Sequence, residues 1–283
     1  MASNPRTIDP ALGLHGLAQR LDAPPGAARF SFQLRHIRER CEEVVACLPE
    51  LVEQTRRQAP RRRRDYHLDR TSHPRSPRGA EARWEHAMWQ KWGPNGRGTY
   101  LPTCPHLQAY QVPLKRPGEE SRWGKVDLLG VSPEFLPVVN ELKQPESNEN
   151  VLRMLTEMAA YGIAVQEAWP TLRCEWEPAM RARFGDAVRV PEHLERVSVI
   201  GVAPTAFWAR HLGWPGSDGT RRVPDEAWPC VCALVAAFRE YHLDISFAVV
   251  EGTAEGQALL PTVTGARRLK LCGEGRGGAV PSP

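Results

Sequence analysis

Trp123-Gly-Lys-Val-Asp-Leu-Leu-Gly130 and, after a short turn, Leu136-Pro-Val-Val-Asn-Glu-Leu-Lys-Gln144 decide how this chain folds. Both segments have the apolar character of buried strands, yet the first contains Asp127 and the second contains Glu141 and Lys143. Burying an unpaired charge is costly, so acids inside apolar strands need a compensating partner. Two acids and a lysine from neighbouring strands can hold a divalent metal ion and position a water beside it.

Strand geometry explains how these side chains could meet. Side chains alternate between the faces of a strand, so Glu141 and Lys143 point the same way and Leu142 points the other way. Asp127 lies on the preceding strand, and adjacent strands are about 4.8 Å apart. Like charges that close repel, and one acid would be protonated unless a cation lay between them. Mg²⁺ (or Mn²⁺), which prefers oxygen ligands, resolves the conflict.

Hydrophobic spacing places these strands in an alternating order of helices and strands. The expected elements between residues 80 and 253 are helix 80–92, strands 107–115, 122–131 and 135–143, helix 148–169, strand 196–203, helix 225–242 and strand 245–250. The segment from 170 to 191 has a mixed pattern. This order predicts an α/β domain over 80–253, with a central mixed β-sheet flanked by helices.

The two ends of the chain are expected to be less regular. Residues 1–79 form an N-terminal extension that is irregular over 1–29 and contains a helix over about 30–54, which Pro49 would kink or break. Residues 254–283, rich in glycine and proline, are expected to form a flexible tail.

An arginine-rich linker is predicted over residues 55–79, a segment that contains nine arginines and only two aspartates. The rest of the chain is slightly acidic, although the net charge is +4. Arg61, Arg62, Arg63 and Arg64 could hold a phosphate backbone by releasing its counterions. Equally, such a segment can be a solvated connector that contacts nothing.

The bulk composition indicates an ordinary globular protein. With 283 residues, 41% hydrophobic and 25% charged, the chain is long enough for one sizeable domain with extensions. No apolar run approaches the roughly 20 residues of a membrane helix, and the polar N-terminus lacks a signal-peptide core. We therefore expect a cytoplasmic protein without a membrane partner. The seven scattered cysteines show no zinc-binding spacing, so we expect reduced thiols and no zinc site.

The motifs Gly124-Lys-Val-Asp127 and Asn140-Glu-Leu-Lys143, set in this order of elements, resemble the PD-(D/E)xK nuclease superfamily. The resemblance implies a restriction-endonuclease-like core. It also implies that Asp127, Glu141 and the main-chain carbonyl of Leu142 bind the metal, and that Lys143 is the catalytic lysine. The proline that often precedes the first acid is replaced here by Val126.

Further acids are implied by the same resemblance. Many members carry a glutamate on the first core helix, for which Glu85 is the best candidate and Glu81, one turn earlier, the substitute. One branch carries Gln-x-x-x-Tyr on the helix after the lysine, where this chain departs from the pattern with Glu157 and Tyr161. Gln144, directly after the lysine, is compatible with the family.

The sequence and this resemblance therefore predict a Mg²⁺-dependent hydrolase of phosphodiester bonds, with DNA favoured over RNA as the substrate. One alternative is a non-catalytic nucleic-acid-binding module that kept the fold. Another is a protein-interaction module, in which these residues are structural and residues 1–79 recruit a partner. The structural interpretation of the motif itself is a hairpin in which Asp127 caps a turn and Glu141 and Lys143 pair on the surface. The chain has no phosphate-binding Gly-x-x-x-x-Gly-Lys-Ser/Thr loop, so no built-in ATPase is expected.

Overall fold

The computed structural model describes residues 8–21, 30–60, 62, 64–66, 68, 79–115, 123–147, 149–212, 227–253 and 261–269 of the chain. Within these ranges the helices are a 3₁₀ turn (Pro10–Leu12), α1 (Gly13–Ala18), α2 (Phe30–Ala46), α3 (Leu48–Gln58), α4 (Ala80–Trp92), α5 (Val151–Phe184), α6 (Thr205–Leu212) and α7 (Ala227–Arg239). The strands are β1 (His106–Pro113), β2 (Lys125–Val131), β3 (Pro137–Leu142), β4 (Val197–Pro204), β5 (Leu243–Thr253) and β6 (Thr262–Leu269).

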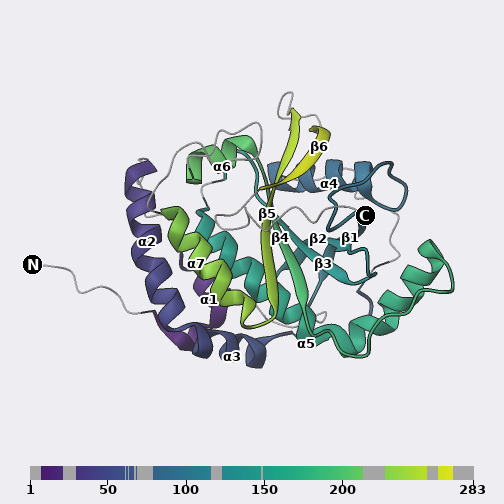
Figure 1. The fold of residues 1–283 in the computed structure, drawn as a ribbon, viewed down its shortest axis with the longest axis horizontal. Helices are drawn as coiled ribbons and strands as arrows, with labels where there is room; N and C mark the ends of the chain where they lie inside the picture. Colours follow the sequence, from purple (N-terminus) through teal and green to yellow (C-terminus); the bar gives the residue numbers. More distant parts are fainter. Residues whose placement is uncertain are drawn as a thin grey trace, which may run out of the picture.

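These strands form a six-stranded sheet in the order β1-β2-β3-β4-β5-β6 (Figure 1). β1, β2 and β3 are successively antiparallel, β3, β4 and β5 run parallel, and β6 returns antiparallel beside β5. The connection between β3 and β4 contains α5, and the connection between β4 and β5 contains α6 and α7. The predicted α/β architecture, with a mixed central sheet flanked by helices, is confirmed.

Helices cover both faces of the sheet. α4 contacts β1, β2, β3 and β6, whereas α5 contacts β3, β4 and β5, and α7 contacts β5. Alternate side chains of each strand therefore enter two different apolar clusters. In β2, Leu128 belongs to the cluster of Trp84 and Met88 on α4, and Leu129 belongs to the cluster that surrounds α5. Every residue of β3 is buried, as expected of a central strand.

Helix α5 is about one and a half times as long as the sequence indicates. A helix is predicted to end at residue 169, and the segment from 170 to 191 to be mixed, but α5 continues to Phe184 with Pro170 and Pro178 inside it. Both prolines lie on the exposed side of the helix, where water can satisfy a carbonyl that has lost its N–H partner. Trp176 and Met180 are buried on the other side, and this packing outweighs the cost of the prolines.

The N-terminal helices share the core around α5. The prediction that residues 1–29 are irregular is wrong for residues 10–18, which form the 3₁₀ turn and α1. The sequence did not reveal α1 because a six-residue helix with two glycines is too short to show a hydrophobic period. Leu14 of α1 is fully buried, and its N–H donates to Thr55 Oγ1 on α3 at 2.7 Å. The predicted break near Pro49 is confirmed: α2 ends at Ala46, and Pro49 lies in the first turn of α3, where a proline needs no N–H partner.

Strand β6 is a further departure from the expected elements. The flexible tail predicted over 254–283 is wrong for residues 262–269, which pair with β5 along its C-terminal half. Val263 and Leu269 are buried, and Arg267 Nε lies 3.0 Å from Glu251 Oε1 on β5. The strand is a weak sequence signal because polar residues and a glycine interrupt its apolar alternation.

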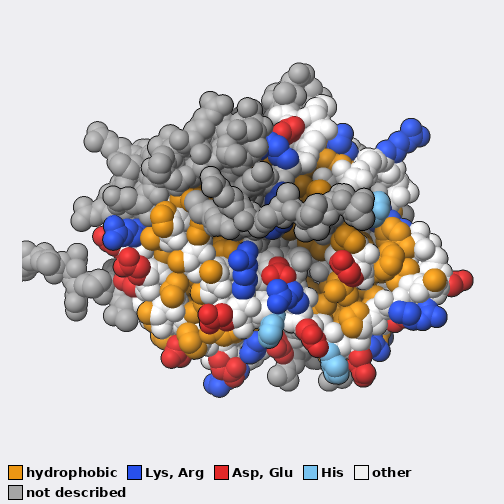
Figure 2. Space-filling view, in the orientation of Figure 1, with side chains coloured by type: hydrophobic (Ala, Val, Ile, Leu, Met, Phe, Trp, Pro, Cys, Tyr) orange, Lys and Arg blue, Asp and Glu red, His pale blue; other side chains and the backbone are white. Residues whose placement is uncertain are grey.

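The surface charge and the hydrophobicity of the helices are the remaining features of the described structure. Acidic and basic side chains are interspersed on the face shown in Figure 2, so the described acids there do not gather in one patch. No helix among the described residues is long and apolar enough to cross a membrane.

We expect Gly162→Val to destabilise the protein by about 1–3 kcal/mol, because α5 lies too close to the sheet for a side chain there. A Cβ at Gly162 would come within 2.8 Å of Leu243 and 2.9 Å of Val199. Chemical denaturation measures the effect. The same residue introduced at exposed Cys174 on α5 should cost less than about 0.7 kcal/mol, the helix-propensity difference. Equal losses at both positions would contradict close packing at Gly162.

Candidate active site

The candidate site lies where β2 and β3 separate. The ladder between these strands runs from Val131–Pro137 to Leu128–Asn140 and is not continued by the next pair. There, Asp127 Oδ2 accepts a hydrogen bond from the Leu142 main-chain N–H at 2.8 Å. A carboxylate thus replaces the carbonyl that would normally accept this N–H, and the strand ends are held together around it.

Lys143 is the central cation of the site. Its ammonium Nζ lies 2.7 Å from Glu141, 2.8 Å from Glu149, 3.2 Å from Glu157 and 3.9 Å from Glu81. Glu141 and Lys143 are each only 3% exposed. Their predicted orientation to one side is confirmed, whereas the surface ion pair of the alternative hairpin is contradicted, because both charges are buried.

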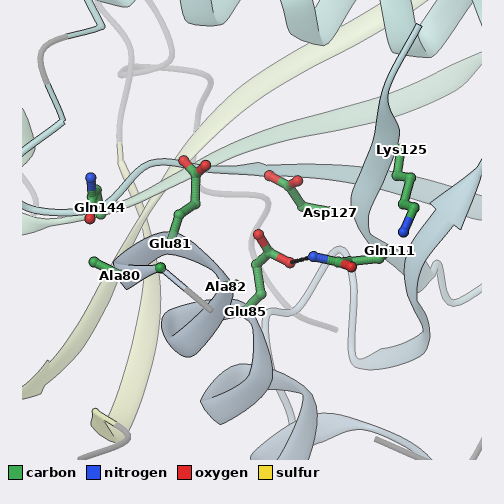
Figure 3. A pocket seen from close by; sticks show the side chains of 9 residues that line it. Ala80, Glu81, Ala82, Glu85, Gln111, Lys125, Asp127 and Gln144 are labelled. Atoms are coloured by element: carbon green, nitrogen blue, oxygen red, sulfur yellow. Dashed lines mark hydrogen bonds between the residues drawn. The ribbon is translucent and has the colours of Figure 1, made fainter. Parts of the chain in front are cut away.

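The first two turns of helix α4 contribute two more acids to the site, Glu81 and Glu85. Glu85 is buried, and its Oε2 accepts a hydrogen bond from Gln111 Nε2 of β1 at 3.1 Å (Figure 3). Glu81 lies one turn earlier and is more exposed. A pocket of about 480 Å³ opens onto this group; it is lined by Gly79, Ala80, Glu81, Ala82, Glu85, Gln111, Lys125, Asp127 and Gln144.

Burial and mutual repulsion keep these acids from ionising freely. Burial, reinforced by the charges of Glu81 and Glu141, raises the pKa of Glu85 to about 8. Burial and the charge of Glu85 raise the pKa of Asp127 well above its usual range, and burial and the charge of Asp127 do the same for Glu141. Burial alone would lower the pKa of Lys143. The surrounding carboxylates raise this pKa by more than burial lowers it, so the net shift is upward. One ammonium is therefore shared among more acids than it can neutralise.

The donor set suits a hard divalent cation. Asp127, Glu141 and Glu85 supply carboxylate oxygens from β2, β3 and α4, and Glu141 Oε2 is buried without a hydrogen-bond partner within the described part of the chain. A cation there would give this oxygen a partner and relieve the repulsion. In the described ranges, no three Asp, Glu, His or Cys side chains are already gathered closely enough to form a metal site. The ligand roles of Asp127, Glu141, Glu85 and the Leu142 carbonyl thus stay predictions.

The accessory residues predicted from the sequence lie around this centre. Glu157 contacts Lys143, and Gln144 lines the pocket. Tyr161, one turn further along α5, packs its ring 6.2 Å from that of Trp123. Its hydroxyl lies so close to β2 that a Cβ at Gly124 would come within 2.9 Å of it, which explains the glycine in this motif.

The arginines predicted to bind nucleic acid are placed only in part. Arg62 is buried, and its guanidinium donates to the main-chain carbonyls of Lys115 and Asp65, so its described role is to tie two segments together. This differs from the predicted contact with phosphate. Arg64 is exposed and lies near its neighbour Asp65. Arg61 and Arg63 lie outside the described residues.

Three site residues escaped the sequence analysis. Glu149 precedes α5 and gave no motif signal, although its position six residues after Lys143 could have suggested a return to the site. Lys125 is part of the quoted motif and lies on the same face of β2 as Asp127, two residues away. Gln111 gave no signal at all, because its role depends on a left-handed backbone conformation that the sequence does not reveal.

We expect Glu85→Gln to stabilise the metal-free protein at pH 8 by up to about 4 kcal/mol, and to have almost no effect at pH 4.5. A carboxyl whose pKa is raised on folding holds its proton in the native state after the unfolded chain has released it. Stability is therefore lost as the pH rises from the unfolded value towards about 8.

Urea denaturation in the presence of a chelator at several pH values measures this difference. Glu195→Gln, at an exposed carboxylate, is the matched control and should show little pH-dependent change. A gain from Glu85→Gln that does not vary with pH would show that Glu85 ionises normally in the folded protein.

No protein-family model, curated protein or solved structure matches this chain. The function proposed below therefore rests on the geometry and the charges of the site.

Proposed function

We propose that this protein is a metal-dependent nuclease with a PD-(D/E)xK site on a restriction-endonuclease-like core. The observation that carries the proposal is the convergence of Asp127, Glu141 and Lys143 at the point where β2 and β3 separate. Glu85 of α4 lies beside Asp127 in the same pocket, and the resemblance implies a further glutamate on this helix. Buried acids gathered around too little positive charge favour a cation-binding role over a purely structural one.

In this proposal, Asp127, Glu141 and the Leu142 carbonyl hold Mg²⁺ or Mn²⁺, with Glu85 as a further oxygen ligand. The bound ion would supply the positive charge that activates a water and offsets charge on the phosphate. Lys143 is held as an ammonium by its carboxylate neighbours. It is therefore better suited to stabilising negative charge on the attacked phosphate, or to orienting the water, than to removing a proton.

The substrate proposed is DNA, whose phosphates would enter the pocket from the side of Lys125. This lysine is exposed at the rim, whereas Glu141 and Lys143 lie deeper. A rim cation can attract a phosphate that the acids alone would repel. A binding module without chemistry would gain nothing from buried acids facing a polyanion, which favours catalysis over the non-catalytic alternative.

We expect Asp127→Asn to reduce metal-dependent DNA cleavage by about 100-fold or more while the protein stays folded. The amide oxygen of asparagine can still accept the Leu142 N–H, so the strand ends keep their contact. Lys143→Ala is a poorer test, because it removes the cation that pairs with buried Glu141 and with the partly buried Glu149 and Glu157, and so endangers the fold.

The assay uses linear, circular and single-stranded DNA, and RNA, with Mg²⁺, with Mn²⁺ and with a chelator. Asp186→Asn, at an exposed aspartate, is the control and should cleave like the wild type. If wild-type protein binds DNA with a steep salt dependence but cleaves none of these polymers with either metal, the non-catalytic module replaces the nuclease proposal.

A further inference from the structure

Gln111 has a backbone conformation that its side chain does not favour. It lies in β1 with a φ of +48°, in the left-handed region where glycine is the usual residue. Its neighbours are paired with β2, Tyr110 with Leu128 and Val112 with Val126. Gln111 therefore lies across from Asp127, and the strained residue faces the acid at the centre of the site.

The side chain of Gln111 explains what this conformation achieves. Its amide Nε2 donates to Glu85 Oε2 at 3.1 Å, which links β1 to α4 across the pocket (Figure 3). The other Glu85 oxygen is left facing the side of the pocket where Asp127 and Glu81 lie. The hydrogen bond thus fixes which oxygen of Glu85 is directed towards the proposed metal position.

We propose that Gln111 is a positioning residue that orients the Glu85 carboxylate for the metal ion. This inference rests on the proposed function, because it assumes that Glu85 is an oxygen ligand. Strained backbone conformations persist at functional sites when the strain holds a group in place. If the left-handed φ at position 111 served only the fold, glycine would adopt it at less cost. Glycine, however, has no side-chain amide that could donate a hydrogen bond to Glu85.

Gln111→Gly should have two effects of opposite direction. Relief of the left-handed strain should keep or raise the melting temperature of the metal-free protein. Loss of the amide should weaken Mn²⁺ binding by about 10-fold or more, as removal of a residue that orients a metal ligand typically does. A residue needed only for the fold would not improve stability while weakening metal affinity.

A double-mutant cycle shows whether Gln111 acts through Glu85. Mn²⁺ affinity is measured by calorimetry on the full chain for wild type, Gln111→Gly, Glu85→Gln and the double variant. We expect Gln111→Gly to weaken binding in the wild-type background and to have little further effect once Glu85 is replaced. His242→Gly, which relieves the same kind of strain at a φ of +62° just before β5, should leave Mn²⁺ affinity unchanged.

Wild-type affinity retained in Gln111→Gly would overturn the inference and leave the proposed nuclease intact. Equal weakening with and without Glu85 would also overturn it, because Gln111 would then act independently of that carboxylate. If the wild-type protein binds no Mn²⁺ at all, the proposed function fails and the role of Gln111 fails with it.

Discussion

Crowding of buried and partly buried acids around Lys143 is the constraint on which the rest of the structure depends. The acids come from different elements: Glu141 from β3, Asp127 from β2, Glu85 from α4 and Glu157 from α5. Both faces of the sheet must therefore be packed well enough to hold like charges together. The apolar clusters on α4 and around α5 supply that packing, and a divalent cation would remove the remaining repulsion.

The separation of β2 from β3 turns this crowding into a site. The Asp127 carboxylate accepts the Leu142 N–H at the end of the β2–β3 ladder. The two strands are not paired beyond Leu128–Asn140, so side chains bound the space there. Two features of the neighbouring backbone lie close to this acid in the fold. Gly124 leaves room for the Tyr161 hydroxyl, and Gln111 takes up a left-handed conformation across from Asp127. Local strain of this kind is typical of sites where geometry matters more than stability.

Much of the fold, and the centre of the site, could be predicted from the sequence. The bounds of α4 and the central strands follow from simple periodicity, and strand alternation alone placed Glu141 beside Lys143. The continuation of α5 beyond Pro170 could not be predicted, because buried tryptophans outweigh a local helix breaker. Gln111 was missed for a different reason: a positive φ at a non-glycine residue leaves no trace in composition or period.

The most direct test of the proposed metal centre is anomalous scattering from crystals soaked in Mn²⁺. The proposal requires a Mn²⁺ peak bound by Asp127 and Glu141 and lying beside the Leu142 carbonyl, with Lys143 adjacent. The same experiment on Asp127→Asn crystals should give a much weaker peak or none. Absence of a peak at this position in wild-type crystals, with Lys143 still bound to its carboxylates, would mean that the buried charges are structural and that the nuclease proposal is wrong.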